Sequence, residues 1–344
     1  MIAGRLHAVG EELRLDHVHI PRIGPEDVLV KVSASGVCHS DINYIRGIAP
    51  VGRLPITLGH EIAGVVAKTG RRVRGIKQGE RVCVHYVVHC GRCKFCRTGK
   101  ENYCTKYRMM GKDVDGGFAE YVSVPANSIV RLPGAIPFEQ GAIMGCAVST
   151  AFHALNRGRT QRGDHVVVFG VGGLGAHAIQ LASKIFKSAS VTAVDLLEAK
   201  LVLAKMLGAT AVVNGSERDP VETVRRTTDG RLADVVIDFV GQERTMEKAV
   251  ECVGKGGRMV LVGIGARQMR LQPYRMIIGK EMEIVGVNDH LKTELVQLVK
   301  MVDSGRIDLS KSVTHRVSLE EINSGIHILE ENLGNPVRVV VTES

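Results

Sequence analysis

The stretch that decides the fold is His165-Val-Val-Val-Phe-Gly-Val-Gly-Gly-Leu-Gly175. The continuous apolar run His165–Phe169 is typical of a buried parallel strand, and the glycine-rich turn opens a helix that we expect to reach about Lys187. A second predicted strand, Ser190–Val194, ends in Asp195, at the spacing from the glycines where the fingerprint G-x-G-x-x-G places its acidic residue. This order of strand, turn, helix and strand is the context that the fingerprint requires, and it predicts a β-α-β unit that binds a dinucleotide.

The same stretch predicts which dinucleotide is bound. Glycines allow the backbone to approach a pyrophosphate at a helix N-terminus, and the carboxylate of Asp195 should accept hydrogen bonds from the adenosine-ribose hydroxyls. A 2′-phosphate would be repelled by this carboxylate, and no arginine follows in Leu196-Leu197-Glu198. The sequence therefore predicts NAD rather than NADP as the cofactor. The cofactor-binding residues predicted from the fingerprint are Gly170, Gly172, Gly173, Gly175 and Asp195.

The chain after this unit continues with βα spacing, whereas the chain before it does not. Further strands are predicted at Ala211–Val213, Asp234–Phe239, Arg258–Gly263 and Glu283–Val287, with helices between most of them. Together with the first two they make six parallel strands that fit the doubly wound order. Residues 1 to about 35 instead alternate apolar and polar side chains, which is typical of short antiparallel strands. The predicted fold class is α/β, with a separate β-rich part.

Four cysteines lie close together in a loop rich in glycine, lysine and arginine, namely Cys90, Cys93, Cys96 and Cys104. Thiols at this spacing are hard to explain as core residues, and local positive charge helps to hold thiolates. An iron–sulfur cluster is the alternative, but the bacterial ferredoxin run has its fourth cysteine sooner and follows it with proline. We therefore predict a Cys₄ zinc site. Because protein fills all four positions, this zinc is structural and stabilises a lobe of about residues 88–106.

A second metal site is predicted from residues that lie far apart in the sequence. Cys38 precedes a predicted helix for which Ser40 or Asp41 is a plausible N-cap, His60 stands at a predicted strand start, and Cys146 lies in a segment with helical spacing. A Cys₂His set leaves a fourth coordination position open, as a catalytic zinc requires. Each motif alone is weak, and a lone cysteine before a helix is more often a core residue.

Composition excludes several other classes of function. The 344 residues suggest about two domains, and the absence of Trp argues against stacking platforms for single-stranded nucleic acid. The net charge is +9, but the basic residues are scattered, so no nucleic-acid partner is predicted. No signal peptide or membrane-spanning run is recognisable, which predicts a cytoplasmic protein without a membrane partner. In that setting the eight cysteines are better explained as metal ligands than as disulfides.

Together these motifs resemble the zinc-dependent medium-chain alcohol dehydrogenases across nearly the whole chain. The resemblance is carried by Gly36-Val-Cys38-His-Ser-Asp41, Gly59-His-Glu61 with Gly64, the four-cysteine loop, Asp115-Gly-Gly-Phe-Ala-Glu-Tyr121, Gly145-Cys146, and the fingerprint with Asp195. It implies a GroES-like, β-rich catalytic domain built from residues 1–152 and 290–344. A six-stranded Rossmann domain, residues 153–289, is then inserted between these two parts.

The resemblance also implies roles for single residues. Cys38, His60 and Cys146 would hold the catalytic zinc, so that the chain would hold two zinc ions. Ser40 resembles the hydroxyl that takes the alcohol proton, and Asp41 resembles the carboxylate that orients the zinc-bound histidine. Glu61 would be a nearby or transient ligand. Further cofactor contacts are implied for His39 and Arg338 (pyrophosphate), Lys200 (ribose), Thr150 and Leu174 (nicotinamide), and Val262.

Two stretches depart from the family pattern. Many members carry a histidine five residues after the first zinc cysteine, and it passes the proton to solvent. This chain has Asn43 there, and an amide cannot take up a proton at neutral pH. The stretch Asn288-Asp-His-Leu291 replaces the small residues usual after the sixth strand. It could shape the substrate cleft or have no chemical role.

The implied reaction is the reversible oxidation of a primary or secondary alcohol to an aldehyde or ketone, with hydride transfer to NAD. Polyols, amino alcohols and acyl-CoA-linked alcohols are alternative substrates, although polyol-type members often use Glu where this chain has Cys146. A more remote alternative is a non-catalytic zinc- and nucleotide-binding protein. The predicted edge strand Glu283–Val287 resembles one that family members pair across a two-fold axis, which implies a homodimer or homotetramer.

Overall fold

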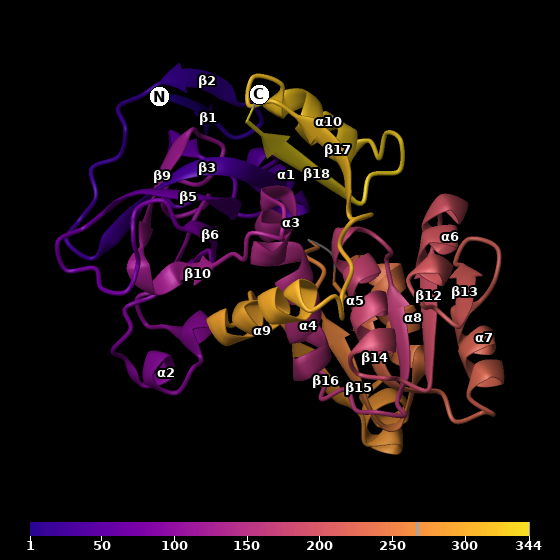
Figure 1. Cartoon of the computed structure of the whole chain (residues 1–344). Coiled ribbons are helices and arrows are strands. Elements are labelled where there is room, and N and C mark those ends of the chain that lie inside the picture. Colours follow the sequence, from indigo (N-terminus) through magenta and orange to yellow (C-terminus); the bar gives the residue numbers. More distant parts are fainter. Residues whose placement is uncertain (266–267, 344) are drawn as a thin grey trace. The chain divides into compact units, whose positions relative to one another are not determined.

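The computed structural model describes residues 1–265 and 268–343, and the chain divides into two compact units (Figure 1). Unit 1 combines Met1–Ser149 with the C-terminal part from Asp289 onward, and unit 2 is Thr150–Asn288. The boundaries expected from the sequence, 152/153 and 289/290, lie close to these divisions. Unit 2 is therefore an insertion in the chain of unit 1.

Unit 2 is built on a parallel six-stranded sheet with the strand order β13-β12-β11-β14-β15-β16. Each neighbouring pair of strands is parallel. The strands are β11 (His165–Phe169), β12 (Ser190–Asp195), β13 (Ala211–Asn214), β14 (Ala233–Asp238), β15 (Val253–Leu261) and β16 (Glu283–Gly286). This is the doubly wound order that the sequence predicted.

Helices cover both faces of this sheet. They are α4 (Ser149–Arg157), α5 (Gly173–Lys184), α6 (Glu198–Met206), α7 (Pro220–Thr227) and α8 (Glu243–Cys252). The chain runs outward from β11 to β13 and then returns to β14 and continues to the other edge. Because crossovers between parallel strands are right-handed, α5 and α6 lie on one face and α7 and α8 on the other, and each pair is in contact. The direction reverses between β11 and β14, and ligands of such sheets bind at the carboxyl ends of the strands there.

Unit 1 is dominated by antiparallel strands. Its largest sheet has the order β10-β6-β5-β3-β18-β17, with β9 pairing on β3. A second sheet has the order β2-β1-β4, and β7 pairs with β8. The strands are β1 (Ile2–Leu6), β2 (Arg14–His17), β3 (Asp27–Val37), β4 (Ile56–Thr57), β5 (Glu61–Thr69), β6 (Arg81–Val84), β7 (Val87–Val88), β8 (Arg108–Met109), β9 (Tyr121–Pro125), β10 (Ile129–Arg131), β17 (Val313–Val317) and β18 (Arg338–Thr342).

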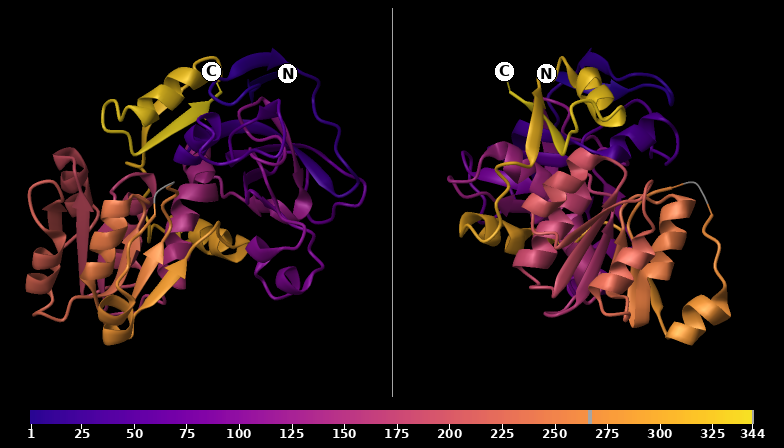
Figure 2. Two further views of the ribbon diagram at one scale, coloured as in Figure 1. Left: turned by 180° about the vertical axis from the view of Figure 1, so that it is seen from behind. Right: turned by 90° about the vertical axis from the view of Figure 1, so that its right-hand side faces the viewer.

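The two ends of the chain build this unit together. β18, near the C-terminus, pairs antiparallel with β3, and the two termini lie on the same side of unit 1 (Figure 2). Its helices are α1 (His39–Ile45), α2 (Lys94–Arg97), α3 (Phe138–Ile143), α9 (Lys292–Asp303) and α10 (Ile322–Glu330), and one π-helical turn follows α3 at Met144–Val148. One of its cores joins Leu6 and Phe118 to Val339 and Val341. Within residues 1–265 and 268–343, we find no helix with the length and apolarity needed to cross a membrane.

Candidate active site

Side chains that ligate metals form two clusters, both in unit 1. In each cluster, one ligand atom from every residue lies within 4.8 Å of all the others. The first cluster is Cys90, Cys93, Cys96 and Cys104, and the second is Cys38, His60, Glu61 and Cys146. None of the eight cysteines, all of which lie among the described residues, takes part in a disulfide. The structure thus gathers both predicted ligand sets, although the members of the second set lie far apart in the sequence.

The four-cysteine cluster fits a zinc ion by its donor chemistry. The Sγ atoms of Cys93 and Cys96 lie 3.5 Å apart, and Cys104 Sγ accepts hydrogen bonds from the backbone N–H groups of Cys90 and Lys106, both at 3.3 Å. Hydrogen bonds from the N–H groups of Cys96 and Thr105 lower the pKa of the Cys93 thiol to about 6. Backbone donors therefore favour the thiolate form of Cys93, which is the form that binds zinc, whereas burial raises the pKa of the Cys96 thiol.

Three separate elements supply the ligands of the second cluster. Cys38 is the N-cap of α1, His60 immediately precedes β5, and Cys146 lies in the π-helical turn. Gly59 makes the turn before His60 possible, because its φ is +86° and an added Cβ would lie 2.6 Å from the ring of Phe118. Cys38 and Cys146 are each 6% exposed and His60 is fully buried. A buried Cys₂His set of this kind fits zinc as a catalytic ligand set.

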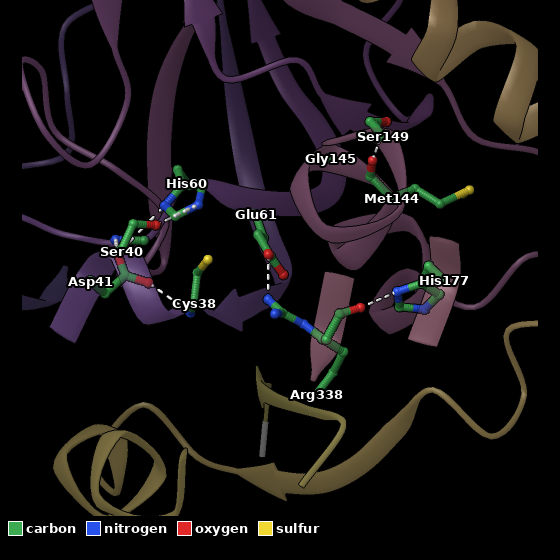
Figure 3. A network of polar contacts seen from close by, with 12 residues as sticks. Cys38, Ser40, Asp41, His60, Glu61, Met144, Gly145, Ser149, His177 and Arg338 are labelled. Atoms are coloured by element: carbon green, nitrogen blue, oxygen red, sulfur yellow. Dashed lines mark hydrogen bonds and ion pairs between the residues drawn. The ribbon is translucent and has the colours of Figure 1, made fainter. Parts of the chain in front are cut away.

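Asp41, in the first turn of α1, lies beside His60. Its Oδ2 accepts a hydrogen bond from the Cys38 backbone N–H at 2.9 Å, and its Oδ1 lies 3.5 Å from His60 Nδ1 (Figure 3). Burial acts to lower the pKa of His60, but Asp41 and Cys38 outweigh it and raise that pKa well above its ordinary value. This carboxylate therefore faces Nδ1, and Nε2 is the nitrogen available to a metal. The sequence suggested Ser40 or Asp41 as the N-cap, which is wrong: Cys38 caps the helix, and Asp41 is the third helical residue of a capping box.

Glu61, the fourth member of the second cluster, forms a buried ion pair with Arg338 (Figure 3). Burial raises the pKa of Glu61 to about 7, although the Arg338 guanidinium opposes this rise. Arg338 is 2% exposed. The sequence offered Arg338 as a contact for the cofactor pyrophosphate; the structure adds Glu61 as its partner, and the pyrophosphate contact stays a prediction.

The other residues of this region that the sequence singled out lie on α1. Ser40 Oγ is 3.5 Å from His60 Nε2, so its hydroxyl stands beside the cluster. His39 is exposed and Asn43 is half-buried. The positions of Ser40 and His39 leave their predicted roles in proton transfer and cofactor binding as predictions.

The fingerprint of unit 2 adopts the geometry that its glycines permit. Gly170 has φ +85°, and Gly172 is the N-cap of α5. A Cβ on Gly175 would lie 1.8 Å from the carbonyl oxygen of Gly170, so the helix and the turn meet backbone to backbone. The backbone N–H groups at the start of α5 thus face the carboxyl edge of the sheet, where an anionic pyrophosphate would be stabilised.

Asp195 ends β12 and is tied to the fingerprint. Its Oδ2 accepts a hydrogen bond from the Val171 N–H at 2.7 Å, and its Oδ1 accepts from the Leu196 N–H at 2.8 Å. Lys200 is 5% exposed; burial lowers its pKa, while Asp195 opposes the shift. Of the remaining predicted cofactor residues, Thr150 is buried, and Leu174 and Val262 are half-buried.

Comparisons with known proteins agree with this geometry. Residues 24–134 match the family described as "Alcohol dehydrogenase GroES-like domain", and residues 173–304 match "Zinc-binding dehydrogenase". The NAD-dependent alcohol dehydrogenase of Sulfurisphaera tokodaii is 34% identical, and the similarity covers 96% of each chain. The L-threonine 3-dehydrogenase of Symbiobacterium thermophilum is 35% identical over 96% of this chain and 94% of that protein.

The solved structure of the alcohol dehydrogenase from Aeropyrum pernix is similar at a TM-score of 0.91 and 34% identity, covering 99% of this chain and all of that one. The chain belongs to the zinc-binding alcohol dehydrogenase family. The predicted fold class, a GroES-like domain with an inserted Rossmann domain, is thereby confirmed. As a member of this family the chain is an oxidoreductase, and the predicted zinc and NAD agree with its ligand clusters and its named relatives.

Sequence reasoning about this alcohol dehydrogenase missed two groups of residues. Asp238 is buried at the carboxyl end of β14, where it holds the next loop, and its position at the end of an apolar strand was the available signal. Asp289 and His290 contact the surroundings of the metal cluster in unit 1. Their departure from the family pattern was noted, but it did not reveal the contacts.

Proposed function

We propose that this alcohol dehydrogenase reversibly oxidises a primary or secondary alcohol to the aldehyde or ketone and reduces NAD. The observation that carries the proposal is the buried cluster of Cys38, His60 and Cys146, oriented by Asp41, in the same chain as an intact dinucleotide fingerprint. A metal cluster alone would fit a binding protein, and a fingerprint alone would fit any dinucleotide enzyme. Their combination supports hydride transfer at a metal-activated hydroxyl.

Zinc bound by these residues would supply a Lewis acid that lowers the pKa of an alcohol hydroxyl. The chain itself then has to hold the ligands and accept the proton. The 3.5 Å separation between Ser40 Oγ and His60 Nε2 supports Ser40 as the first acceptor of that proton. Asn43 cannot carry the proton further, so the later part of the relay differs from that of members with a histidine at this position.

The preference for NAD rests on Asp195. Both of its oxygens already accept backbone N–H groups, which supports a carboxylate fixed at the end of β12 where an adenosine ribose would bind. Replacing Asp195 by Gly should raise the ratio of NADP to NAD turnover, because the charge that repels a 2′-phosphate is removed. An unchanged ratio would count against its ribose role.

The test of the reaction is a panel of alcohols, aldehydes and ketones scored by nicotinamide absorbance, with NAD and NADP in parallel. The panel should include polyols and amino alcohols, since a relative with 35% identity is named L-threonine 3-dehydrogenase. The His60→Ala variant should lose turnover, and His19→Ala, at an exposed histidine, should keep it. Turnover by His60→Ala at the wild-type rate would refute the assignment of the metal site.

Two further features support proposals about the assembly and the location of this protein. β16 is an edge strand of the unit 2 sheet, and its residues are exposed or half-buried, which supports pairing with a second copy as a homodimer or homotetramer. Light scattering at the mass of one chain would contradict this. The eight cysteines, all among the described residues, form no disulfide, and six of them lie in metal-ligand clusters, which suits a reducing compartment such as the cytoplasm.

A further inference from the structure

Two adjacent residues of unit 1, Asp289 and His290, make buried contacts that the proposed reaction does not use. Asp289 is 9% exposed and His290 is fully buried. The backbone of Asp289 is left-handed, with φ +60°, a conformation that non-glycine residues adopt only at some cost. This bend precedes α9 and directs the two successive side chains to two different neighbours.

Asp289 holds the ring that touches His60. The Tyr86 hydroxyl donates a hydrogen bond to Asp289 Oδ1 at 3.2 Å, and the Tyr107 hydroxyl donates to the same carboxylate. The ring of Tyr86 meets the imidazole of His60 edge to face, with centroids 5.2 Å apart and an interplanar angle of 81°. His60 is thus fixed from two sides, by Asp41 at Nδ1 and by this ring.

His290 holds the peptide group that precedes Cys146. Its Nε2 lies 2.6 Å from the carbonyl oxygen of Gly145, and because a carbonyl only accepts, Nε2 carries the proton and donates. His85 in turn donates from Nε2 to the carbonyl of His290 at 3.0 Å. These contacts form a chain of donors from His85 through His290 to Gly145.

The turn that carries Cys146 needs such partners. Met144–Val148 is π-helical, so its hydrogen bonds do not follow the α-helical pattern. Ser149 Oγ donates to the carbonyl of Met144 at 2.6 Å (Figure 3). His290 donates to the carbonyl of Gly145. Side chains therefore supply donors to two successive carbonyls immediately before Cys146.

We propose that Asp289 and His290 are positioning residues of the catalytic metal site, Asp289 acting on His60 through Tyr86 and His290 acting on Cys146 through Gly145. One two-residue segment thus supports two of the three ligands. The inference rests on the proposed role of Cys38, His60 and Cys146 as a metal site. Partners in the second layer around a metal typically change its affinity about 10- to 100-fold, and the same range is expected here.

The chain contains its own control, because the Cys₄ cluster binds a second zinc with different residues. Zinc release from the loaded protein is followed with an excess of a coloured chelator in the wild type, His290→Leu and Tyr86→Phe. The variant Tyr86→Phe keeps the ring and removes only the hydroxyl that reaches Asp289. Tyr274→Phe, at a residue that is 80% exposed in unit 2, is the matched control.

The wild type should release two zinc ions in two separate phases. In His290→Leu and Tyr86→Phe, release from the catalytic site should be about 10- to 100-fold faster, while release from the Cys₄ site stays unchanged. His290→Gln, whose amide can donate to the same carbonyl, should restore a slower rate. With cobalt in the catalytic site, both damaging variants should also shift its visible absorption bands, a signature that a general loss of stability does not produce.

Several outcomes overturn the inference. Wild-type release rates and cobalt spectra in both damaging variants would show that the two residues do not position the ligands. Equal acceleration at both zinc sites would show general loosening instead. If His290→Leu does not fold, Tyr86→Phe decides alone. A wild type that binds one zinc, at the Cys₄ site only, would refute the proposed function itself, which separates that failure from a failure of this inference.

Discussion

Replacing Asp238 by Asn should loosen the loop after β14 and weaken dinucleotide binding. Asp238 is fully buried, and its Oδ1 and Oδ2 accept hydrogen bonds from the N–H groups of Val240 at 3.0 Å and Gly241 at 3.1 Å. Its backbone carbonyl accepts from the N–H groups of Val262 and Gly263, both at 3.0 Å. One residue therefore joins the loops after β14 and β15, at the sheet edge where ligands bind in this fold.

The size of the effect follows from these contacts. An amide keeps one acceptor oxygen but presents an NH₂ group to the other N–H donor, so the variant loses one bond to a charged acceptor and weakens the second. Such bonds contribute about 1.5–3 kcal/mol each. Burial of the carboxylate, which raises the pKa of Asp238 above its ordinary value, offsets part of this. We expect a net loss of about 2 kcal/mol, within the range for a single hydrogen bond to a charged group.

The loops have little room to relax around this loss. Gly241 has φ +74°, and an added Cβ there would lie 2.6 Å from the carbonyl carbon of Gly263, so the two loops already pack backbone to backbone. If most of the lost free energy, about 2 kcal/mol, appears as disorder of these loops, NADH binding has to order them again. The Kd for NADH should then rise at least tenfold, since about 1.4 kcal/mol corresponds to a factor of ten.

Fluorescence titration of the zinc-loaded protein with NADH measures this Kd, and Asp234→Asn is its control. Asp234 stands on the same strand, and its Oδ2 accepts a hydrogen bond from the His165 N–H at 2.7 Å, but at the amino end of β14. Both variants should lose unfolding free energy, whereas only Asp238→Asn should bind NADH more weakly. Equal affinity for NADH in the two variants would refute the reasoning.

Three other predictions concern single contacts. Lys280 Nζ donates to the carbonyls of Val250, Glu251 and Val253, where α8 ends and β15 begins, at 2.7–3.2 Å. Lys280→Met should therefore cost about 2–3 kcal/mol in urea unfolding, while Lys255→Met, at an exposed lysine, should cost almost nothing. Burial and neighbouring His290 hold the pKa of His85 well below its usual range. Below about pH 6.5, His85 is therefore protonated in the unfolded chain but stays neutral in the folded chain. The free energy of unfolding then falls as pH falls, by up to about 1.4 kcal/mol per pH unit. His85→Gln should remove this pH-dependent component from urea midpoints measured across pH. Gly175→Ala would place a Cβ 1.8 Å from the Gly170 carbonyl oxygen, so it should abolish NADH binding in titration and leave the zinc content by atomic emission unchanged.

How far the sequence could predict the fold depends on the range of the interactions that define each element. The strand β11 was predicted residue for residue, because an apolar run between a turn and a glycine fingerprint is a local signal. The strand β15 was predicted at Arg258–Gly263, but it begins at Val253, which pairs with Ala233 on the neighbouring strand. The first residue of β15 is thus determined by its pairing with β14, and the whole of α8 lies between the two strands in the sequence. The neighbouring residues in the sequence therefore give no signal for where β15 begins.

Helix ends show the same limit. We expected the helix after the fingerprint to reach about Lys187, but α5 ends at Lys184, and the backbone of Lys187 is left-handed with φ +54°. Lysine is a good helix former, so its propensity gave no warning. At α1, acidic residues are favourable both at the N-cap and in the first helical turn, and composition alone could not decide that Asp41 is the third helical residue rather than the cap.

The ligands of the metal site could be predicted from the sequence, whereas the residues that support these ligands could not. Its ligands were predictable because thiol and imidazole groups bind zinc far better than other side chains, so few combinations of Cys and His had to be considered. The residues that support the ligands, Asp289 and His290, were not predictable. They act through the ring of Tyr86 and the backbone carbonyl of Gly145, and many residue types could supply such contacts. A motif search would therefore give the same result for a chain with Leu at position 290. If zinc release from that variant is faster, then identical ligand motifs in this family do not guarantee equal affinity for zinc. The segment before α9 then has to be considered, together with the ligands, when the affinity of the site is predicted.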